Sequence, residues 1–170
     1  MSTTCGMLRA VALSVDSPGE VLARVNEALS ARIPASMFVT CFYAILDLKS
    51  GSLRYANAGH DLPYVRRGGA ADELRARGMP LGLMPSMSYE EKETILEAGE
   101  RALFYSDGLV EAHNAEGEMF GFTRLRLLLT EHDDEGLLVD VLMEELYSFT
   151  GDGWEQEDDI TVVTLRRATH

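Results

Sequence analysis

Hydrophobic residues follow two helical periodicities near the amino terminus and then form a continuous apolar run. Residues 3–13 and 17–34 each predict a helix, and the second opens with an N-cap serine, Ser17, before a proline at the first helical position, Pro18. Residues 37–47 are almost continuously apolar and rich in aromatic and β-branched side chains, which predicts a strand covered on both faces. The chain is therefore expected to begin as two helices followed by a strand.

Further strand patterns occupy the middle and the end of the chain, at residues 52–58, 62–67, 89–96, 101–106 and 160–166. The first two of these stretches follow the apolar run through short polar turns, so a three-stranded meander is expected there. The next two are joined by Glu97-Ala98-Gly99-Glu100 and are expected to pair as a second hairpin. Residues 68–80 are interpreted as a polar connection between these two groups of strands.

Helical spacing returns after Gly108. A short segment at 109–113 and two longer ones at about 123–131 and 135–149 predict helices before the final strand. No internal repeat, low-complexity tract or linker divides the sequence, so a single domain over residues 1–170 is expected.

The composition is that of an ordinary globular protein. With 170 residues, of which 46% are hydrophobic and 25% charged, the chain is long enough to bury a core of its own. No stretch approaches the roughly 18 apolar residues of a membrane helix, and the first 13 residues lack the layout of a signal peptide, so a cytoplasmic protein without a membrane partner is expected. Cys5 and Cys41 lie in apolar surroundings without metal-ligand spacing and are interpreted as buried reduced thiols.

The chain is strongly acidic, and this limits its partners. Fifteen basic against 28 acidic residues give a net charge of −13, which repels nucleic acid and anionic lipid surfaces. A phosphorylated substrate is repelled as well, unless bound cations reverse the local field. Any phosphate-handling function of this chain therefore requires a metal ion.

Carboxylates stand where two apolar strands end and begin. Asp107 closes the run that starts at Ala102, and the pair Asp158-Asp159 opens the run that starts at Ile160. If these strands pair antiparallel, the end of one lies beside the start of the other, and their acids converge on one edge of a sheet. Converging carboxylates are a natural site for hard divalent cations, and Gly108 lets the backbone approach a ligand closely.

A structural interpretation stands beside each of these candidates. Asp-Gly is also an ordinary turn, and Asp158-Asp159 also fits a solvated loop that continues the acids Glu155 and Glu157. His60, in the turn after a strand, fits a general acid, a metal ligand or a structural residue. A Ser/His/Asp hydrolase built from Ser106 and His60 lacks the glycine two positions before the serine. No role is assigned to His113, His132 or His170.

Five short motifs, taken in order, resemble a known family: Asn57-Ala58-Gly59-His60, Pro80-Leu81-Gly82-Leu83, Tyr105-Ser106-Asp107-Gly108-Leu109-Val110-Glu111-Ala112, Phe120-Gly121 and Asp158-Asp159-Ile160-Thr161. Their order and spacing are similar to the SpoIIE-like branch of the PPM metal-dependent serine/threonine protein phosphatases. The resemblance runs through essentially the whole chain.

The resemblance implies an α+β fold, an αββα sandwich of two mainly antiparallel sheets flanked by helices. It also implies a centre of two Mn²⁺ or Mg²⁺ ions that activates a water for attack on phosphoserine or phosphothreonine. On this basis Asp107 and Asp158 are expected to be catalytic metal ligands, Asp159 a lesser ligand and Gly108 part of the wall of the metal site. Asn57 and His60 match a motif expected to support the site. The expected partner is a phosphorylated regulatory protein of the anti-sigma factor antagonist type.

One motif of that family is absent from this sequence. A Gly-Asp-Val-Ser-Gly-type segment, whose Asp bridges the two metals, is expected before the first long helix, and the sequence contains none. The domain is therefore expected to be amino-terminally incomplete and to lack its first strands. We expect at most one weakly bound metal and little phosphatase activity from the chain as given. Either it is a weakly active phosphatase domain that regulates a sigma factor, or it is a non-catalytic binding module that engages a regulatory partner protein through exposed sheet edges and its helical face. Exposed edges also favour pairing with a second copy, so self-association as a homodimer is expected.

Overall fold

The computed structural model describes residues 2–34, 36–131, 138–151, 153–156 and 158–168. Within these residues the chain forms two antiparallel sheets together with helices. The residues divide into two compact units, one made of residues up to 60 and 75–96, the other of 61–74 and the residues from 97 onward. No helix among the described residues is both long and apolar enough to span a membrane.

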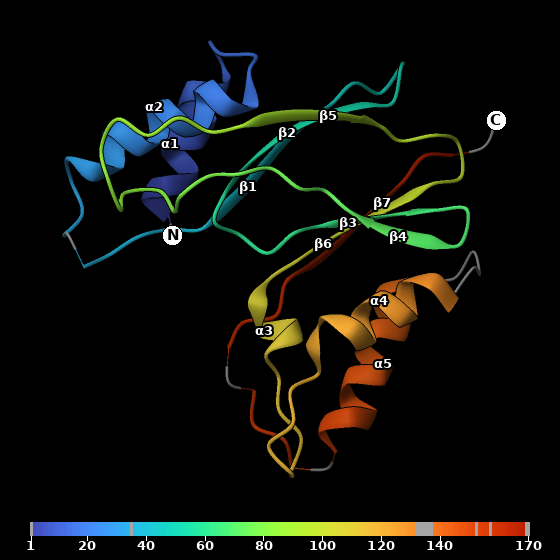
Figure 1. Ribbon diagram of the computed structural model, residues 1–170. Coiled ribbons are helices and arrows are strands. Elements are labelled where there is room, and N and C mark those ends of the chain that lie inside the picture. The colour runs from blue at the N-terminus through green and yellow to red at the C-terminus, as the bar shows by residue number, and fades with distance from the viewer. Residues whose placement is uncertain (1, 35, 132–137, 152, 157, 169–170) are drawn as a thin grey trace. The chain divides into compact units, whose positions relative to one another are not determined.

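The first unit combines two helices with a three-stranded sheet (Figure 1). Its elements are α1 (Ser2–Ala12), α2 (Pro18–Ser30), β1 (Cys41–Leu46), β2 (Ser52–Ala58) and β5 (Glu91–Ile95), and the strand order is β1-β2-β5. Ser17 caps α2 as expected, because its side chain accepts a hydrogen bond from the Glu20 amide at 3.2 Å.

Helix α2 provides the core of this unit. Its apolar side packs with Ala56 and Ala58 of β2, through the buried residues Val21, Leu22, Val25 and Leu29. Each fully buried side chain of this size contributes about 1.5–3 kcal/mol relative to an exposed one. The apolar residues of α2 recur on one face of the helix. Packing of that face on the sheet stabilises the helix more than intrinsic helix propensity does.

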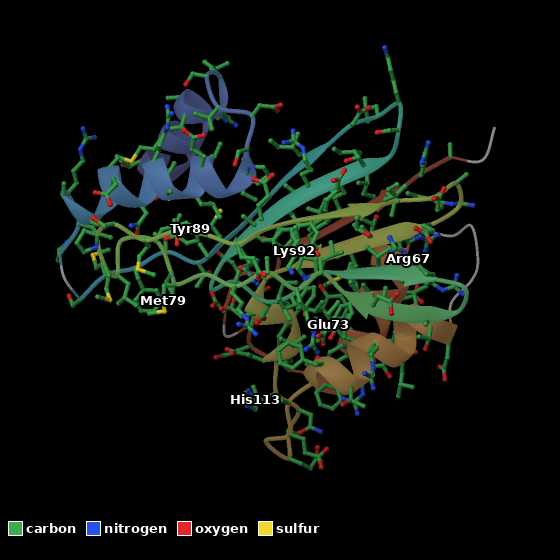
Figure 2. All side chains as sticks on the ribbon, turned by 45° about the horizontal axis from the view of Figure 1, so that its top comes forward. Arg67, Glu73, Met79, Tyr89, Lys92 and His113 are labelled. Carbon is green, nitrogen blue, oxygen red and sulfur yellow. The ribbon has the colours of Figure 1, made fainter. Side chains whose placement is uncertain are left out.

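The second unit combines a four-stranded sheet with three helices. Its elements are β3 (Tyr64–Arg67), β4 (Ala70–Glu73), β6 (Arg101–Tyr105), α3 (Asp107–Val110), α4 (Gly121–Glu131), α5 (Leu138–Thr150) and β7 (Val162–Arg166), and the strand order is β4-β3-β6-β7. Buried leucines from both long helices pack with Leu103 of β6, and Arg124 of α4 stacks over the Phe149 ring at 4.0 Å. Figure 2 shows Arg67 and Glu73 on the β3–β4 hairpin of this sheet.

The strands expected from the sequence exist, but their pairing differs from the prediction. The three-stranded meander is wrong, because the second edge of β2 is taken by β5, and the third predicted strand, β3, lies in the other sheet. The hairpin of 89–96 with 101–106 is wrong for the same reason, since β6 pairs with β3 and β7. Apolar patterns define strands but carry no information on which distant strand will be the neighbour.

The expected polar connection at 68–80 contains a strand that the hydrophobic pattern missed. Gly68 and Gly69 have φ values of 51° and 85° and form the two-residue turn between Arg67 and Ala70, which pair across the hairpin. Two consecutive positive φ values are the requirement of a type I′ turn. The Gly-Gly dipeptide was therefore a usable signal for β4, whose own residues are too polar and too few to show a strand period.

Strand β1 is shorter and more exposed than expected. It starts at Cys41, and of residues 37–40 the only pairing in the described structure is a bridge from Val39 to Leu81. All six of its residues are half-buried, so the prediction of a strand covered on both faces is wrong. The reason is its place at the edge of the sheet, which the apolar composition alone does not reveal. The prediction of two buried thiols is also wrong for Cys5, which is exposed on α1, while Cys41 is half-buried.

The expected helices are confirmed with shifted ends. The predicted segments 3–13, 123–131 and 109–113 appear as α1, α4 and α3, the last beginning two residues earlier at Asp107. Helix α5 is described from Leu138, so the expected start at 135 lies outside the described residues, as do His132, Glu157 and His170. The final strand starts at Val162 rather than Ile160.

Candidate functional site

The end of β6 lies beside the start of β7. These strands pair antiparallel with Tyr105 opposite Val162, and the Ser106 amide donates to the Thr161 carbonyl at 2.9 Å. The expected antiparallel pairing of the two runs is therefore confirmed. It brings the Asp107-Gly108 segment next to the Asp158-Asp159 segment, although 51 positions separate Asp107 from Asp158 in the sequence.

Gly108 is the point of closest approach between the two segments. It is buried in the first turn of α3, and a Cβ atom placed on it would lie 2.8 Å from the Asp159 carbonyl oxygen and 3.4 Å from that of Asp158. Both distances are to backbone atoms, which cannot move aside as a flexible side chain can. The glycine is therefore required for close packing of one backbone segment on the other.

The carboxylates beside this contact are exposed to solvent. One oxygen of Asp107 accepts a hydrogen bond from the Gly108 amide at 3.0 Å, and one oxygen of Asp158 accepts from the Asp159 amide at 2.7 Å. Within the described residues no lysine, arginine or histidine forms an ion pair with Asp107, Asp158 or Asp159. Each carboxylate keeps an oxygen for a further ligand.

These donors fit a divalent cation by type but are too few for a complete site. Carboxylate and backbone carbonyl oxygens are the ligands that Mg²⁺ and Mn²⁺ prefer. Across the described residues, however, no group of three or more histidine, cysteine, aspartate or glutamate side chains is placed to hold a metal ion. The junction of β6 and β7 therefore brings acid-bearing segments together without such a group among the described residues, and metal binding by Asp107 and Asp158 stays a prediction.

Asn57 and His60 form a closed turn at the end of β2. The Asn57 side-chain amide donates to the His60 carbonyl at 2.8 Å, and its side-chain oxygen accepts from the His60 amide, also at 2.8 Å. Gly59 between them has a φ of 72°, and a Cβ atom there would lie 2.8 Å from the Pro80 ring. These contacts lie within the first compact unit. They account for both residues structurally, and their support of the metal site stays a prediction.

The Ser106 hydroxyl is used by the main chain within its own unit. The Ser106 hydroxyl bonds only to main-chain atoms of Asp159 and Thr161, and the His60 Nδ1 atom lies 3.3 Å from the Thr40 hydroxyl. In the part of the chain that is described, no hydrogen bond joins Ser106 to a histidine. This structural role of Ser106 was not predicted, although the serine stands between a predicted strand and an Asp-Gly turn.

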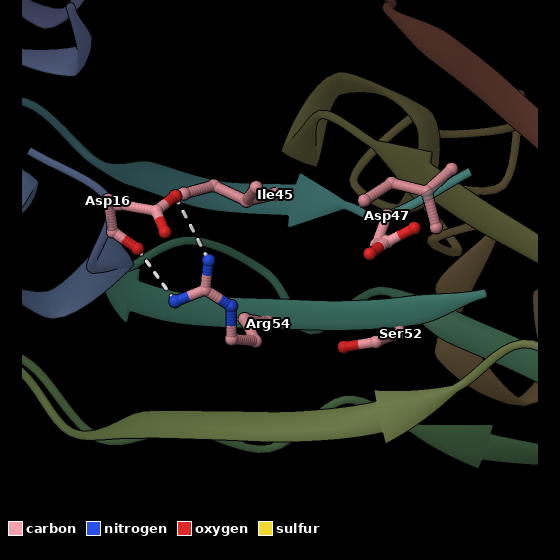
Figure 3. Close-up of a pocket in the computed structure, with 6 residues that line it drawn as sticks. Asp16, Ile45, Asp47, Ser52 and Arg54 are labelled. Carbon is pink, nitrogen blue, oxygen red and sulfur yellow. Dashed lines mark hydrogen bonds and ion pairs between the residues drawn. The ribbon is translucent and has the colours of Figure 1, made fainter. Parts of the chain in front are cut away.

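A cavity of about 310 Å³ on the first unit is lined in part by Asp16, Asp47 and Arg54 (Figure 3). Its charges are already satisfied, because Arg54 donates to the Asp16 carbonyl at 2.6 Å and to its carboxylate at 3.0 Å. Asp47 accepts from the amides of Lys49 and Ser50, and these hydrogen bonds, led by that of Ser50, lower the pKa of its carboxyl. The cavity is explained by the β1–β2 turn, and we assign it no function.

Comparison with known proteins decides the family. The sequence profile of the family described as "Stage II sporulation protein E (SpoIIE)" matches residues 1–168. The chain belongs to the SpoIIE family. The resemblance inferred from its five motifs is thereby confirmed.

Several relatives of this SpoIIE-family chain are known. It is 29% identical over 154 residues to "Phosphoserine phosphatase RsbU" of Bacillus subtilis, covering 88% of this chain and 45% of that protein. It is 31% identical over 134 residues to "Protein IcfG" of Synechocystis sp., covering 78% of this chain and 21% of that protein. The chain therefore spans less than half the length of these curated relatives.

Solved structures establish the fold of this SpoIIE-family chain. The PP2C phosphatase domain of SpoIIE from Bacillus subtilis, solved with a fragment of its regulatory domain, aligns with a TM-score of 0.79 at 24% identity, covering 97% of this chain and 48% of that one. The RsbU and RsbW domains of Rv1364c from Mycobacterium tuberculosis align with a TM-score of 0.78 at 24% identity, covering 99% and 47%. The expected fold of antiparallel sheets and helices is confirmed.

Proposed function

We propose that this chain is a metal-dependent protein serine/threonine phosphatase domain of the PPM type. It would hydrolyse phosphoserine or phosphothreonine on a regulatory protein of the anti-sigma factor antagonist type. Membership of the SpoIIE family and similarity to a relative named phosphoserine phosphatase support this proposal.

The observation that carries the proposal is the junction of β6 and β7. Two chain segments meet there in the Gly108–Asp159 contact, and both carry exposed carboxylates that form no ion pair among the described residues. Exposed carboxylates on segments that are held together by backbone contacts could bind a divalent cation jointly. In a chain with net charge −13, that cation also makes the approach of a phosphate group possible.

Each residue of the junction has a defined part in the proposal. Asp107 and Asp158 hold the Mn²⁺ or Mg²⁺ ion, Asp159 acts as a lesser ligand, and Gly108 allows the two segments to meet. The bound cation would lower the pKa of a coordinated water and neutralise the phosphoryl oxygens. Asn57 and His60 keep the supporting role that their family motif implies.

Activity of the chain as given is proposed to be weak. The sequence contains no Gly-Asp-Val-Ser-Gly segment, and Asp107 and Asp158 supply only part of the ligand set of a two-metal centre. A divalent cation held by few protein ligands keeps most of its water and exchanges readily. We therefore expect binding of a single ion, with low affinity and slow turnover.

A titration of the purified chain with Mn²⁺ tests the proposed metal site, and a phosphoserine-peptide assay tests the proposed weak phosphatase activity. We expect Asp107→Ala and Asp158→Ala to weaken Mn²⁺ binding, whereas Glu145→Ala, at an exposed position of α5, should bind like the wild type. Equal Mn²⁺ binding by all four proteins would refute the metal site. Rapid turnover that disappears in Asp107→Ala would support the phosphatase and overturn the expectation of weak activity.

A second candidate function, a non-catalytic binding module, is favoured by one observation. Strand β1 has no charged residue, and within the described residues no strand other than β2 pairs with it. Proteins commonly protect such edges with charges or prolines, and β5, the other edge of this sheet, carries Glu91, Lys92 and Glu93 (Figure 2 labels Lys92). On this reading the chain engages a regulatory partner protein, and its uncharged edge β1 also pairs with a second copy of the chain.

A further inference from the structure

Ser106 makes two kinds of connection at once. Its amide donates to the Thr161 carbonyl at 2.9 Å, its hydroxyl accepts from the Thr161 amide at 2.9 Å, and the same hydroxyl donates to the Asp159 carbonyl at 2.9 Å. Its own carbonyl accepts from the Leu109 amide at 3.1 Å, inside the first turn of α3. One residue therefore ends the β6–β7 ladder and begins a helix.

The serine hydroxyl replaces a backbone acceptor in the sheet. In a regular antiparallel pair the Thr161 amide would donate to the carbonyl of the opposite residue, which is Ser106. That carbonyl is turned toward Leu109 instead, and the hydroxyl takes its place in the ladder. The chain can leave the sheet at this position without leaving the Thr161 amide unsatisfied.

Ser106 also departs from the usual behaviour of a serine at the start of a helix. It occupies the N-cap position of α3, with φ of −92° and ψ of 160°, but its side chain makes no capping hydrogen bond. A serine in this position ordinarily accepts from the amide two or three residues later. The Gly108 amide is satisfied by the Asp107 carboxylate, so the Ser106 hydroxyl remains available for the segment before β7.

We infer that Ser106 is a positioning residue for the metal-binding carboxylates. It holds the backbone of residues 159–161 against the end of β6, and so sets the position of the Asp158 carboxylate relative to Asp107. The inference deepens the proposed function and rests on it. Ser106 itself is not placed as a metal ligand or a nucleophile, because both directions of its hydroxyl hydrogen bonding are used by the main chain.

Two substitutions of Ser106 test the hydroxyl group specifically, since alanine removes it and threonine keeps it. Ser106→Ala removes the partner of the Thr161 amide and of the Asp159 carbonyl, while the backbone bond from the Ser106 amide and the Gly108 contact remain. Ser106→Thr keeps the hydroxyl, and its β-branched side chain suits the extended backbone at this position. Thr130→Ala is the matched control, because the Thr130 hydroxyl donates only to the Leu127 carbonyl of its own helix.

The experiment measures hydrogen exchange of the Thr161 amide by NMR and Mn²⁺ affinity by titration in the full chain. We expect Ser106→Ala to exchange Thr161 faster while Leu103 and Val163 in the adjoining strands stay protected, and to bind Mn²⁺ on the order of tenfold more weakly. Ser106→Thr and Thr130→Ala should match the wild type in both measurements. Protection of the strand amides shows that Ser106→Ala is folded, so that the change is local.

The outcomes distinguish this inference from the proposed function. Wild-type Mn²⁺ affinity in Ser106→Ala, with the wild-type protein binding Mn²⁺, overturns the positioning role and leaves the phosphatase proposal intact. Absence of Mn²⁺ binding in the wild type sinks the proposed function and the role of Ser106 toward the metal together. In that case faster Thr161 exchange in Ser106→Ala still establishes the backbone link, and unchanged exchange removes that too.

Discussion

The α-carbon of Gly108 packs so closely on the carbonyl of Asp159 that an added Cβ atom would lie 2.8 Å from that oxygen. This contact joins the start of α3 to the segment before β7, and these are the two segments that carry Asp107 and Asp158. The geometry of the candidate site therefore depends on a position that has no side chain.

Replacing Gly108 with alanine should destabilise the protein. The new methyl group would collide with backbone atoms, so one segment has to shift, at a cost of about 1–3 kcal/mol in the free energy of unfolding. Urea denaturation measures this difference. Gly6→Ala is the matched control, because nothing lies within 4 Å of a Cβ at that position in α1, and there alanine should leave stability equal or slightly higher. Equal stability of the two variants would contradict the close contact.

Asn57 should behave as a structural residue of the turn after β2. It is 4% exposed, and Asn57→Ala would leave the His60 amide and carbonyl without their side-chain partner, costing about 1–3 kcal/mol. Asn57→Asp keeps the acceptor for the His60 amide but loses the donor to its carbonyl, so it should also be destabilised. Urea denaturation of both variants checks this expectation. Wild-type stability in either one would show that the reciprocal pair is not formed in solution.

The two cysteines should differ strongly in reactivity. Burial, together with the neighbouring Cys5 thiol, raises the pKa of Cys41 to about 11, so on the order of one thiol in a thousand is ionised at pH 8. Cys5 is exposed on α1. Iodoacetamide at pH 8 should label Cys5 first, as followed by mass spectrometry, and Cys41 should react at a comparable rate only in denaturant.

The raised pKa of Cys41 should make the free energy of unfolding fall as the pH rises above the unfolded pKa of the thiol. The folded state favours the neutral thiol, so this stabilisation is complete below the unfolded pKa of roughly 8.5 and is lost as the pH rises toward 11. Cys41→Ala should therefore reduce the fall in stability between these pH values. A wild-type slope in Cys41→Ala would show that other groups cause the alkaline loss.

Self-association through β1 is expected for the isolated chain. If the β1 strands of two copies pair about a twofold axis, the β1-β2-β5 sheet of one copy continues into that of the other. No charges are brought together, since Cys41–Leu46 contains none. Sedimentation at micromolar concentration should show a dimer that Ile45→Lys disrupts. Ile95→Lys, on the opposite edge of the same sheet, is the control and should leave the dimer intact. A clean wild-type monomer would count against this reading.

Much of the local structure could be predicted because its causes act over a few residues. Ser17 and Pro18 mark the start of α2, and the strand β2 has the predicted bounds, 52–58. The convergence of Asp107 with Asp158 could also be anticipated, since it needs only two strand directions and the rule of antiparallel pairing. The pairing of β2 with β5 was not predictable in this way. Its cross-strand contacts, such as Arg54 opposite Glu93, join residues that no local pattern connects.

By itself, the sequence determined the element types, the acidic character, the family resemblance and the carboxylates at the ends of two strands, because periodicity, capping and charge are properties of nearby residues. Only the tertiary structure decided that β3 pairs in the four-stranded sheet, that β1 is a half-buried edge strand and that the Gly108 backbone packs on Asp159. It also decided that the Ser106 hydroxyl completes the ladder at Thr161. These features depend on packing between segments far apart in the chain. Such packing must bury apolar side chains and satisfy backbone hydrogen-bonding groups at the same time.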